Sequence, residues 1–173
     1  MDPSDVQAIV VHCSAGASSA SVEDIRRLHV EGRGWSDIGY HWLIDANGVV
    51  HAGRDEARVG AHAIGFNHRS IAVCLIGHYD EGRDLLTDAM WEALVDLCTS
   101  LARRYGVDSQ DIVGHRETYD RRGERRLKTC PGTAVNMARL RGAVEQRLNP
   151  PPLDVSWTLT ESECVPRSES VPE

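Results

Sequence analysis

Two residues in the last third of the chain, His115 and Cys130, have side chains that could bind a metal ion together. They lie fifteen positions apart, within a strongly charged stretch from Gly114 to Gly132. A third candidate, His12, ends a short apolar run near the start of the chain. Two imidazoles and a thiolate can hold zinc and leave a fourth position for water, as catalytic zinc sites do. The alternative is that all three are ordinary core or surface residues.

Five further polar residues are candidates for the same site: Tyr40, His62, Asn67, His68 and Lys128. Each has a simpler interpretation. The tyrosine could be a plain strand residue, the two histidines could be solvated loop residues, and the lysine could be one of several exposed bases. Their types alone do not decide between these interpretations.

The elements that must position these residues can be predicted from apolar patterns and turn signals. Short β-branched or apolar runs predict strands at 8–12, 40–44, 49–52, 70–76 and 112–113, and Asn47-Gly48 predicts a tight hairpin between the second and third. Helices are expected after Ser21, after Thr87 and over 135–148, with Gly106 ending the second. Residues 53–69 and the charged stretch after His115 are predicted to be loops.

Strands separated by helices, with one tight hairpin, indicate a single α/β (α+β) domain with a central mixed β-sheet flanked by helices. His12 would end the first strand, and His115 would follow a later one. Ligand sites in open α/β sheets favour the carboxyl ends of strands, so these two histidines are placed where a site is expected.

Composition limits the class of protein. The 173 residues are 41% hydrophobic and 26% charged, as in a globular domain, and the net charge of −7 argues against nucleic acid as a partner. No apolar run is long enough to span a membrane, and the acidic N-terminus does not resemble a secretory signal. The composition changes at Asn149, so we expect a domain over 1–148 and a Pro-rich, acidic, flexible tail over 149–173.

Five motifs follow one another along the chain: V-H-C-S, G-Y-H-W, G-R-D-E-A-R-V-G-A-H-A-I-G-F-N-H-R-S-I-A-V-C-L-I-G, G-H-R-E and K-T-C-P-G. Together they resemble the zinc-dependent N-acetylmuramoyl-L-alanine amidase family, which includes phage T7-type lysozymes and the peptidoglycan recognition proteins. The resemblance runs from about Ala8 to Leu148. One departure is the T-Y-D-R-R-G-E-R-R segment, which makes the stretch between the second histidine and the cysteine longer than in the compact phage version.

The resemblance implies a function for each matching residue. His12, His115 and Cys130 correspond to the family's zinc ligands. Tyr40 of G-Y-H-W and Lys128, two residues before the cysteine, correspond to catalytic residues of the phage-type branch. The lysine would stabilise the oxyanion, whereas the tyrosine would hold the water or pass a proton to the leaving amine.

Two further matches, His62 and Asn67, are implied to line the cleft that binds the peptide. The implied reaction is hydrolysis of the amide between N-acetylmuramic acid and L-alanine in peptidoglycan. We expect a monomeric phage or prophage endolysin, held in the host cytoplasm until release and acting on the wall in the periplasm. A bacterial wall-recycling or secreted toxin amidase remains an alternative, as does a non-catalytic peptidoglycan-binding module. Non-catalytic members typically lose the cysteine, so Cys130 favours the enzyme.

Overall fold

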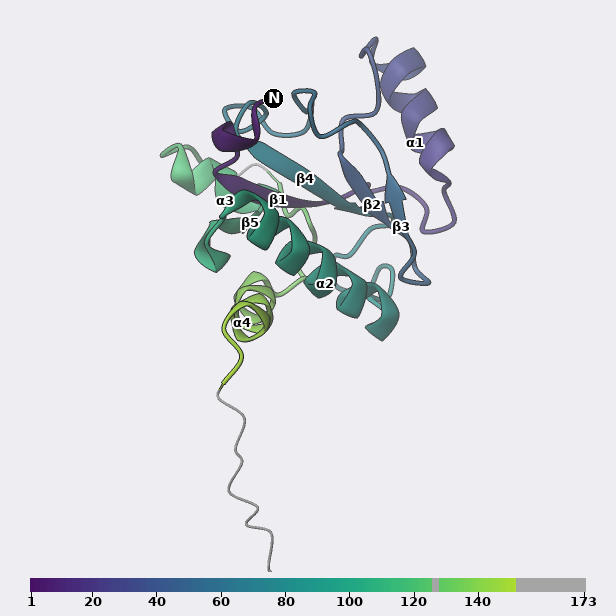
Figure 1. Cartoon of the computed structure of the whole chain (residues 1–173). Coiled ribbons are helices and arrows are strands. Elements are labelled where there is room, and N and C mark those ends of the chain that lie inside the picture. Colours follow the sequence, from purple (N-terminus) through teal and green to yellow (C-terminus); the bar gives the residue numbers. More distant parts are fainter. Residues whose placement is uncertain (126–127, 152–173) are drawn as a thin grey trace, which may run out of the picture.

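A computed structural model describes residues 1–125 and 128–151 (Figure 1). Its strands form one sheet in the order β3-β2-β4-β1-β5. Their bounds are β1 Ala8–Cys13, β2 Trp42–Ile44, β3 Val50–Ala52, β4 Ser70–Leu75 and β5 Ile112–Gly114. All neighbouring pairs are parallel except β2 and β3, which form the antiparallel hairpin predicted at Asn47-Gly48. The fold is therefore the predicted single α/β domain with a mixed sheet.

The helices cover both faces of this sheet. They are α1 Val22–Arg27, which continues as a π-helical turn over Leu28–Gly32, α2 Asp88–Tyr105, α3 His115–Arg121 and α4 Met137–Leu148. Two 3-10 turns, Pro3–Asp5 and Ser109–Asp111, precede β1 and β5. In Figure 1, α2 lies along one face of the sheet with α4 beside it, and α1 lies near the opposite end of the sheet, beyond β2 and β3. No helix in the described part of the chain has the length and apolarity needed to cross a membrane.

Side chains alternate along β1, so His12 and its neighbours in sequence point to opposite faces of the sheet. Ile9, Val11 and Cys13 belong to the large core beneath α2 and α4. Ala8 and Val10 pack on the other face, against residues of the 53–69 segment. Since successive strand residues point to opposite faces, His12 points away from the large core, toward that segment.

The predicted element ends are mostly correct within two residues. Ser21 caps α1 through a capping box with Asp24, and Thr87 caps α2. Gly106 ends α2 in the left-handed conformation, at a φ of 67°. The last helix, predicted from Val135, begins two residues later because Asn136 caps it.

The charged stretch after β5 begins as a helix, so the prediction of a loop is wrong there. α3 starts at His115 itself, and the backbone N–H of Gly114 donates to the Glu117 carboxylate over 2.8 Å. An acidic side chain three residues after the first cap position is a helix-start signal. The motif G-H-R-E therefore contains a helix-start signal, but the many charged residues after it led to the prediction of a loop. Residues 126–127 of this stretch and the predicted tail from residue 152 onward lie outside the described residues.

Candidate metal centre and its two clefts

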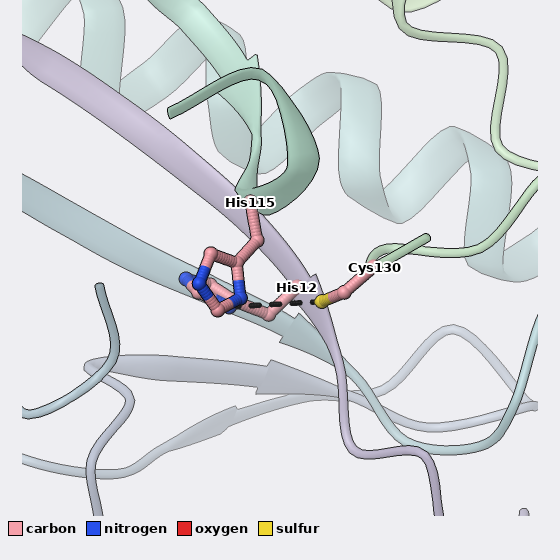
Figure 2. Close-up of side chains that lie close together, drawn as sticks. All are labelled: His12, His115 and Cys130. Carbon is pink, nitrogen blue, oxygen red and sulfur yellow. Dashed lines mark hydrogen bonds between the residues drawn. The ribbon is translucent and has the colours of Figure 1, made fainter. Parts of the chain in front are cut away.

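The structure brings His12, His115 and Cys130 together (Figure 2). One ligand atom from each can be chosen so that all lie within 4.8 Å of one another, and Sγ of Cys130 is 3.8 Å from Nδ1 of His12. The two imidazole rings have centroids 4.6 Å apart. A cluster predicted from residues more than a hundred positions apart is therefore present in the fold.

Strand order explains why the two histidines meet. β1 lies between β4 and β5 and runs parallel to both, so the carboxyl ends of β1 and β5 lie at one edge of the sheet. His12 is the fifth of the six residues of β1, and His115 directly follows β5. Tyr119, one helical turn later on α3, stacks on the His115 ring with centroids 5.8 Å apart. Both imidazoles are almost fully buried, at 1% and 8% exposed.

Burial keeps these imidazoles in the neutral form that binds metals. It lowers the pKa of His115 to about 4, with a smaller contribution from the positive charge of Lys128. Burial, followed by the nearby His62 and His115 rings, also lowers the pKa of His12 well below its usual value. At neutral pH neither ring has to lose a proton before it can act as a ligand.

Cys130 is positioned by backbone contacts rather than by a strand. The N–H of Cys13 donates to its Sγ over 3.3 Å. The N–H of Arg116 donates to its carbonyl over 2.8 Å. The Arg116 guanidinium donates to the carbonyls of Thr129 and Gly132, at 2.9 and 2.6 Å, and to that of Val135 at 2.8 Å. Arg116 thus connects the start of α3 to the whole turn that carries the cysteine.

The donor set fits zinc. Zinc takes tetrahedral nitrogen and sulfur ligands at about 2.0–2.3 Å, which places ligand atoms roughly 3.3–3.6 Å apart. The sulfur–nitrogen distance of 3.8 Å is close to that spacing. The amide of Cys13 supplies the kind of hydrogen bond that orients and stabilises a bound thiolate.

The two predicted catalytic residues both lie near this cluster. The Tyr40 ring packs beside the His12 ring, with centroids 5.2 Å apart, and burial raises the pKa of its hydroxyl well above the usual value. Lys128 is exposed and lines two clefts that meet at the cluster. Its positive charge is near enough to depress the pKa of both candidate ligand histidines, His12 and His115.

The first cleft, which we call the His62 cleft, has a volume of about 530 Å³. The two residues predicted to line a peptide-binding cleft, His62 and Asn67, both line it, together with His115. Their side chains also have contacts inside the protein. Oδ1 of Asn67 accepts the backbone N–H groups of His62 and Ala63, at 2.9 and 2.8 Å. Substrate binding by these residues stays a prediction.

The second cleft, which we call the Thr133 cleft, has a volume of about 910 Å³ and lies on the Cys130 side. It is lined by His78, Arg116, Thr129 and Thr133 as well as by Cys130 and Lys128. The candidate cluster therefore has one hollow beside His115 and another beside Cys130.

Several site residues were missed by sequence reasoning. Arg116 looked like one base among many, and nothing local shows that its guanidinium holds a turn thirteen to nineteen residues away. Trp35, Ile64 and Tyr119 line the His62 cleft but looked like ordinary apolar residues. The exposure of Ile64, at 81%, becomes visible only in the folded chain.

Comparison with known proteins gives the family. The sequence profile described as N-acetylmuramoyl-L-alanine amidase matches residues 2–133. The chain belongs to this family. The endolysin of Enterobacteria phage T3 is 45% identical to it over 104 residues, which cover 57% of this chain and 68% of that protein. The endolysin of Escherichia phage T7 is 46% identical over 103 residues, with the same coverage of both chains.

A solved structure extends the likeness to the fold. The N-acetylmuramoyl-L-alanine amidase LysC from Clostridium intestinale URNW superposes with a TM-score of 0.70 at 26% identity. The match covers 83% of this chain and 87% of that one. The mixed sheet and its helices are thus an arrangement shared within the family.

Proposed function

We propose that this chain is an endolysin that hydrolyses the amide bond between N-acetylmuramic acid and L-alanine in peptidoglycan, using zinc. The observation that carries the proposal is the cluster of two neutral imidazoles and one thiol at the meeting point of two clefts. Membership of the amidase family and the similarity to two phage endolysins support the reaction and the biological setting. In that setting the protein stays in the host cytoplasm until release and then acts on the wall.

The proposed metal ligands are His12, His115 and Cys130. When bound there, zinc supplies Lewis acidity, which polarises the scissile carbonyl and makes water a stronger nucleophile at neutral pH. The protein keeps the two imidazoles neutral by burial and directs an amide N–H at the sulfur. These features prepare the residues to bind a cation without first losing protons from the histidines.

Lys128 and Tyr40 have complementary proposed roles. The ammonium of Lys128, at the junction of the clefts, stabilises the negative charge that develops on the carbonyl oxygen during attack. Tyr40 keeps its proton at neutral pH because burial raises the pKa of its hydroxyl. It can therefore donate a hydrogen bond or a proton to the amine that leaves.

The two clefts suggest how the substrate lies across the metal. An amide substrate has a different group on each side of the scissile bond, and the cluster has a hollow on each side. We assign the peptide stem to the His62 cleft, which His62 and Asn67 line, and the sugar side to the Thr133 cleft.

The test is digestion of purified peptidoglycan by the wild type and by Cys130→Ala, each with and without a chelator. We expect the wild type to release new L-alanine amino termini and no new reducing sugar ends. The variant and the chelated wild type should release neither. Activity that survives both treatments would end the zinc-amidase proposal. Tight binding of peptidoglycan by the wild type without cleavage would identify a binding module instead.

A further inference from the structure

His62 makes a contact that a role in lining the cleft does not include. Its Nδ1 lies 3.0 Å from Nε2 of His12, and the two rings meet edge to face, with planes at 87°. The other nitrogen of His12, Nδ1, faces Sγ of Cys130 at 3.8 Å. The two nitrogens of His12 therefore have different partners: the metal cluster on one side and His62 on the other.

The direction of the hydrogen bond follows from what a metal ligand requires. A neutral imidazole carries one proton, and the nitrogen that binds a metal is the one without it. Nδ1 of His12 faces the cluster, so its proton belongs on Nε2, which donates to Nδ1 of His62. The proton of His62 then lies on its own Nε2. That atom is buried and has no hydrogen-bond partner in the described part of the chain.

The His62 ring is held in place from several directions. Asn67 fixes its backbone by accepting the N–H groups of His62 and Ala63. Gly60 leaves the space that the ring fills, because a Cβ at Gly60 would lie 2.5 Å from Cδ2 of His62 and 3.0 Å from Cε1 of His41. The ring therefore occupies space that any larger residue at position 60 would fill.

His41, which closes this space from behind, is itself fixed. Its Nδ1 accepts the backbone N–H of Ala72 over 2.9 Å, and its Nε2 lies 3.1 Å from the carbonyl of Arg58, to which it donates. Both nitrogens of His41 are thus used by the backbone. It serves as a wall behind His62 and has no free nitrogen to offer it.

We propose that His62 is a positioning residue, which fixes the tautomer and ring orientation of His12 so that Nδ1 of His12 is presented to the metal. The proposal rests on the proposed function for the presence of zinc. The outer partners of metal-bound histidines orient the ligand and tune its basicity. Because His62 is neutral, it orients His12 without the negative charge that a carboxylate partner would add.

The test is zinc affinity, measured by chelator competition on the purified full chain without substrate. His62→Leu removes the acceptor, and we expect zinc to bind about 10–100-fold more weakly. His62→Asn should restore most of that affinity, because its Oδ1 can accept at nearly the position of the lost Nδ1. The matched control is His68→Leu, which changes an exposed histidine of the same segment and should keep wild-type affinity.

Circular dichroism and thermal melting of the zinc-free variants separate misfolding from loss of the contact. If His62→Leu does not fold, His62→Ala replaces it in the same comparison. Equal zinc affinity in the wild type and in a folded acceptor-free variant would overturn the positioning role. Failure of a folded His62→Asn to recover affinity would also overturn it. A wild type that binds no zinc would overturn the proposed function as well.

Discussion

His12 and His115 are placed by strands, whereas Cys130 and Lys128 are placed by a turn at the protein surface. The strand half of the site consists of His12, within β1, and His115, directly after β5. The residues of both strands are almost fully buried and paired in the sheet. The loop half is exposed at Lys128 and Thr129, and it is held by hydrogen bonds from Arg116 to three carbonyls of the turn.

The difference matches what each half is proposed to do. Ligands that must stay neutral are held in the dry interior, where burial lowers the pKa of both histidines. A cation that is proposed to meet substrate has to reach the surface, and Lys128 lines both clefts. Changes to the two halves should therefore affect different properties of the protein.

The largest expected effect comes from the loop half. Lys128→Ala should lower the rate of amide hydrolysis about 10²–10³-fold, because it removes a charge directed at the developing oxyanion. Zinc affinity should stay at the wild-type level, since the lysine is not a proposed ligand. Arg125→Ala, at another exposed base of the same loop, is the control and should keep most of the activity. A parallel loss of zinc from Lys128→Ala would make the lysine structural.

Acid should disturb the strand half. The pKa of His115 is about 4 when folded and about 6.5 when exposed, so the unfolded chain binds the extra proton between these values. The contribution of His115 to the free energy of unfolding is therefore fully present above pH 6.5. As the pH drops toward 4, this contribution falls by about 3 kcal/mol. Urea unfolding of the zinc-free protein at pH 7 and pH 4 measures the fall.

His115→Gln provides the matched comparison for that experiment. It removes the titrating group, so the dependence of the unfolding free energy on pH should become shallower. It should not vanish, because burial also lowers the pKa of His29 to about 4. An unchanged slope in His115→Gln would show that the acid sensitivity arises elsewhere.

The smallest of these effects should follow from loosening the turn. Arg116→Met removes the guanidinium that donates to three carbonyls but keeps the backbone bond to Cys130. We expect zinc affinity to fall about tenfold, equivalent to about 1.4 kcal/mol. Arg121→Met, on the same helix but paired with Asp111, should not change zinc affinity. Equal affinities in all three proteins would mean that Cys130 is positioned without Arg116.

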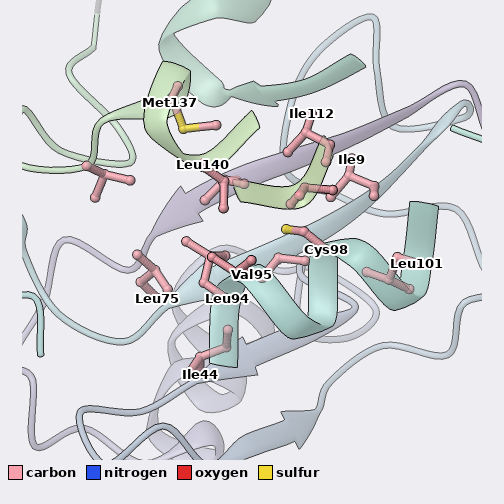
Figure 3. Packing of buried hydrophobic residues seen from close by; sticks show 14 of the residues in the cluster. Ile9, Ile44, Leu75, Leu94, Val95, Cys98, Leu101, Ile112, Met137 and Leu140 are labelled. Carbon is pink, nitrogen blue, oxygen red and sulfur yellow. The ribbon is translucent and has the colours of Figure 1, made fainter. Parts of the chain in front are cut away.

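Local patterns were enough to predict the strands near the site and the long helix α2, but not α3, which begins at His115. The helical spacing of Met90, Leu94, Leu97 and Leu101 predicts the buried face of α2. Met90, Leu94 and Leu101 are at most 1% exposed, whereas Leu97 is only partly buried against the same core. Figure 3 shows Leu94 and Leu101 within the core, with Cys98 between them and Ile9 of β1 nearby. Such predictions succeed because an amphipathic pattern depends mainly on neighbours within a few residues.

Contacts between distant segments could not be predicted in the same way. The bond between the Cys13 amide and Cys130 joins residues 117 positions apart, and the contact between His12 and His62 spans 50. Both depend on strand order, which periodicity does not reveal. The family resemblance indicated candidate residues for the site, but it did not show that Asn67 fixes a backbone turn.

The position of β1 inside the sheet has a consequence for synthesis of the chain. β1 is made before both of its neighbours, which are β4 at residues 70–75 and β5 at residues 112–114. A nascent chain therefore cannot complete this part of the sheet until most of the domain has been translated, even though domains generally fold as units during synthesis. Products that stop before β5 contain His12 but lack His115 and Cys130, so incomplete chains cannot assemble the three-residue cluster.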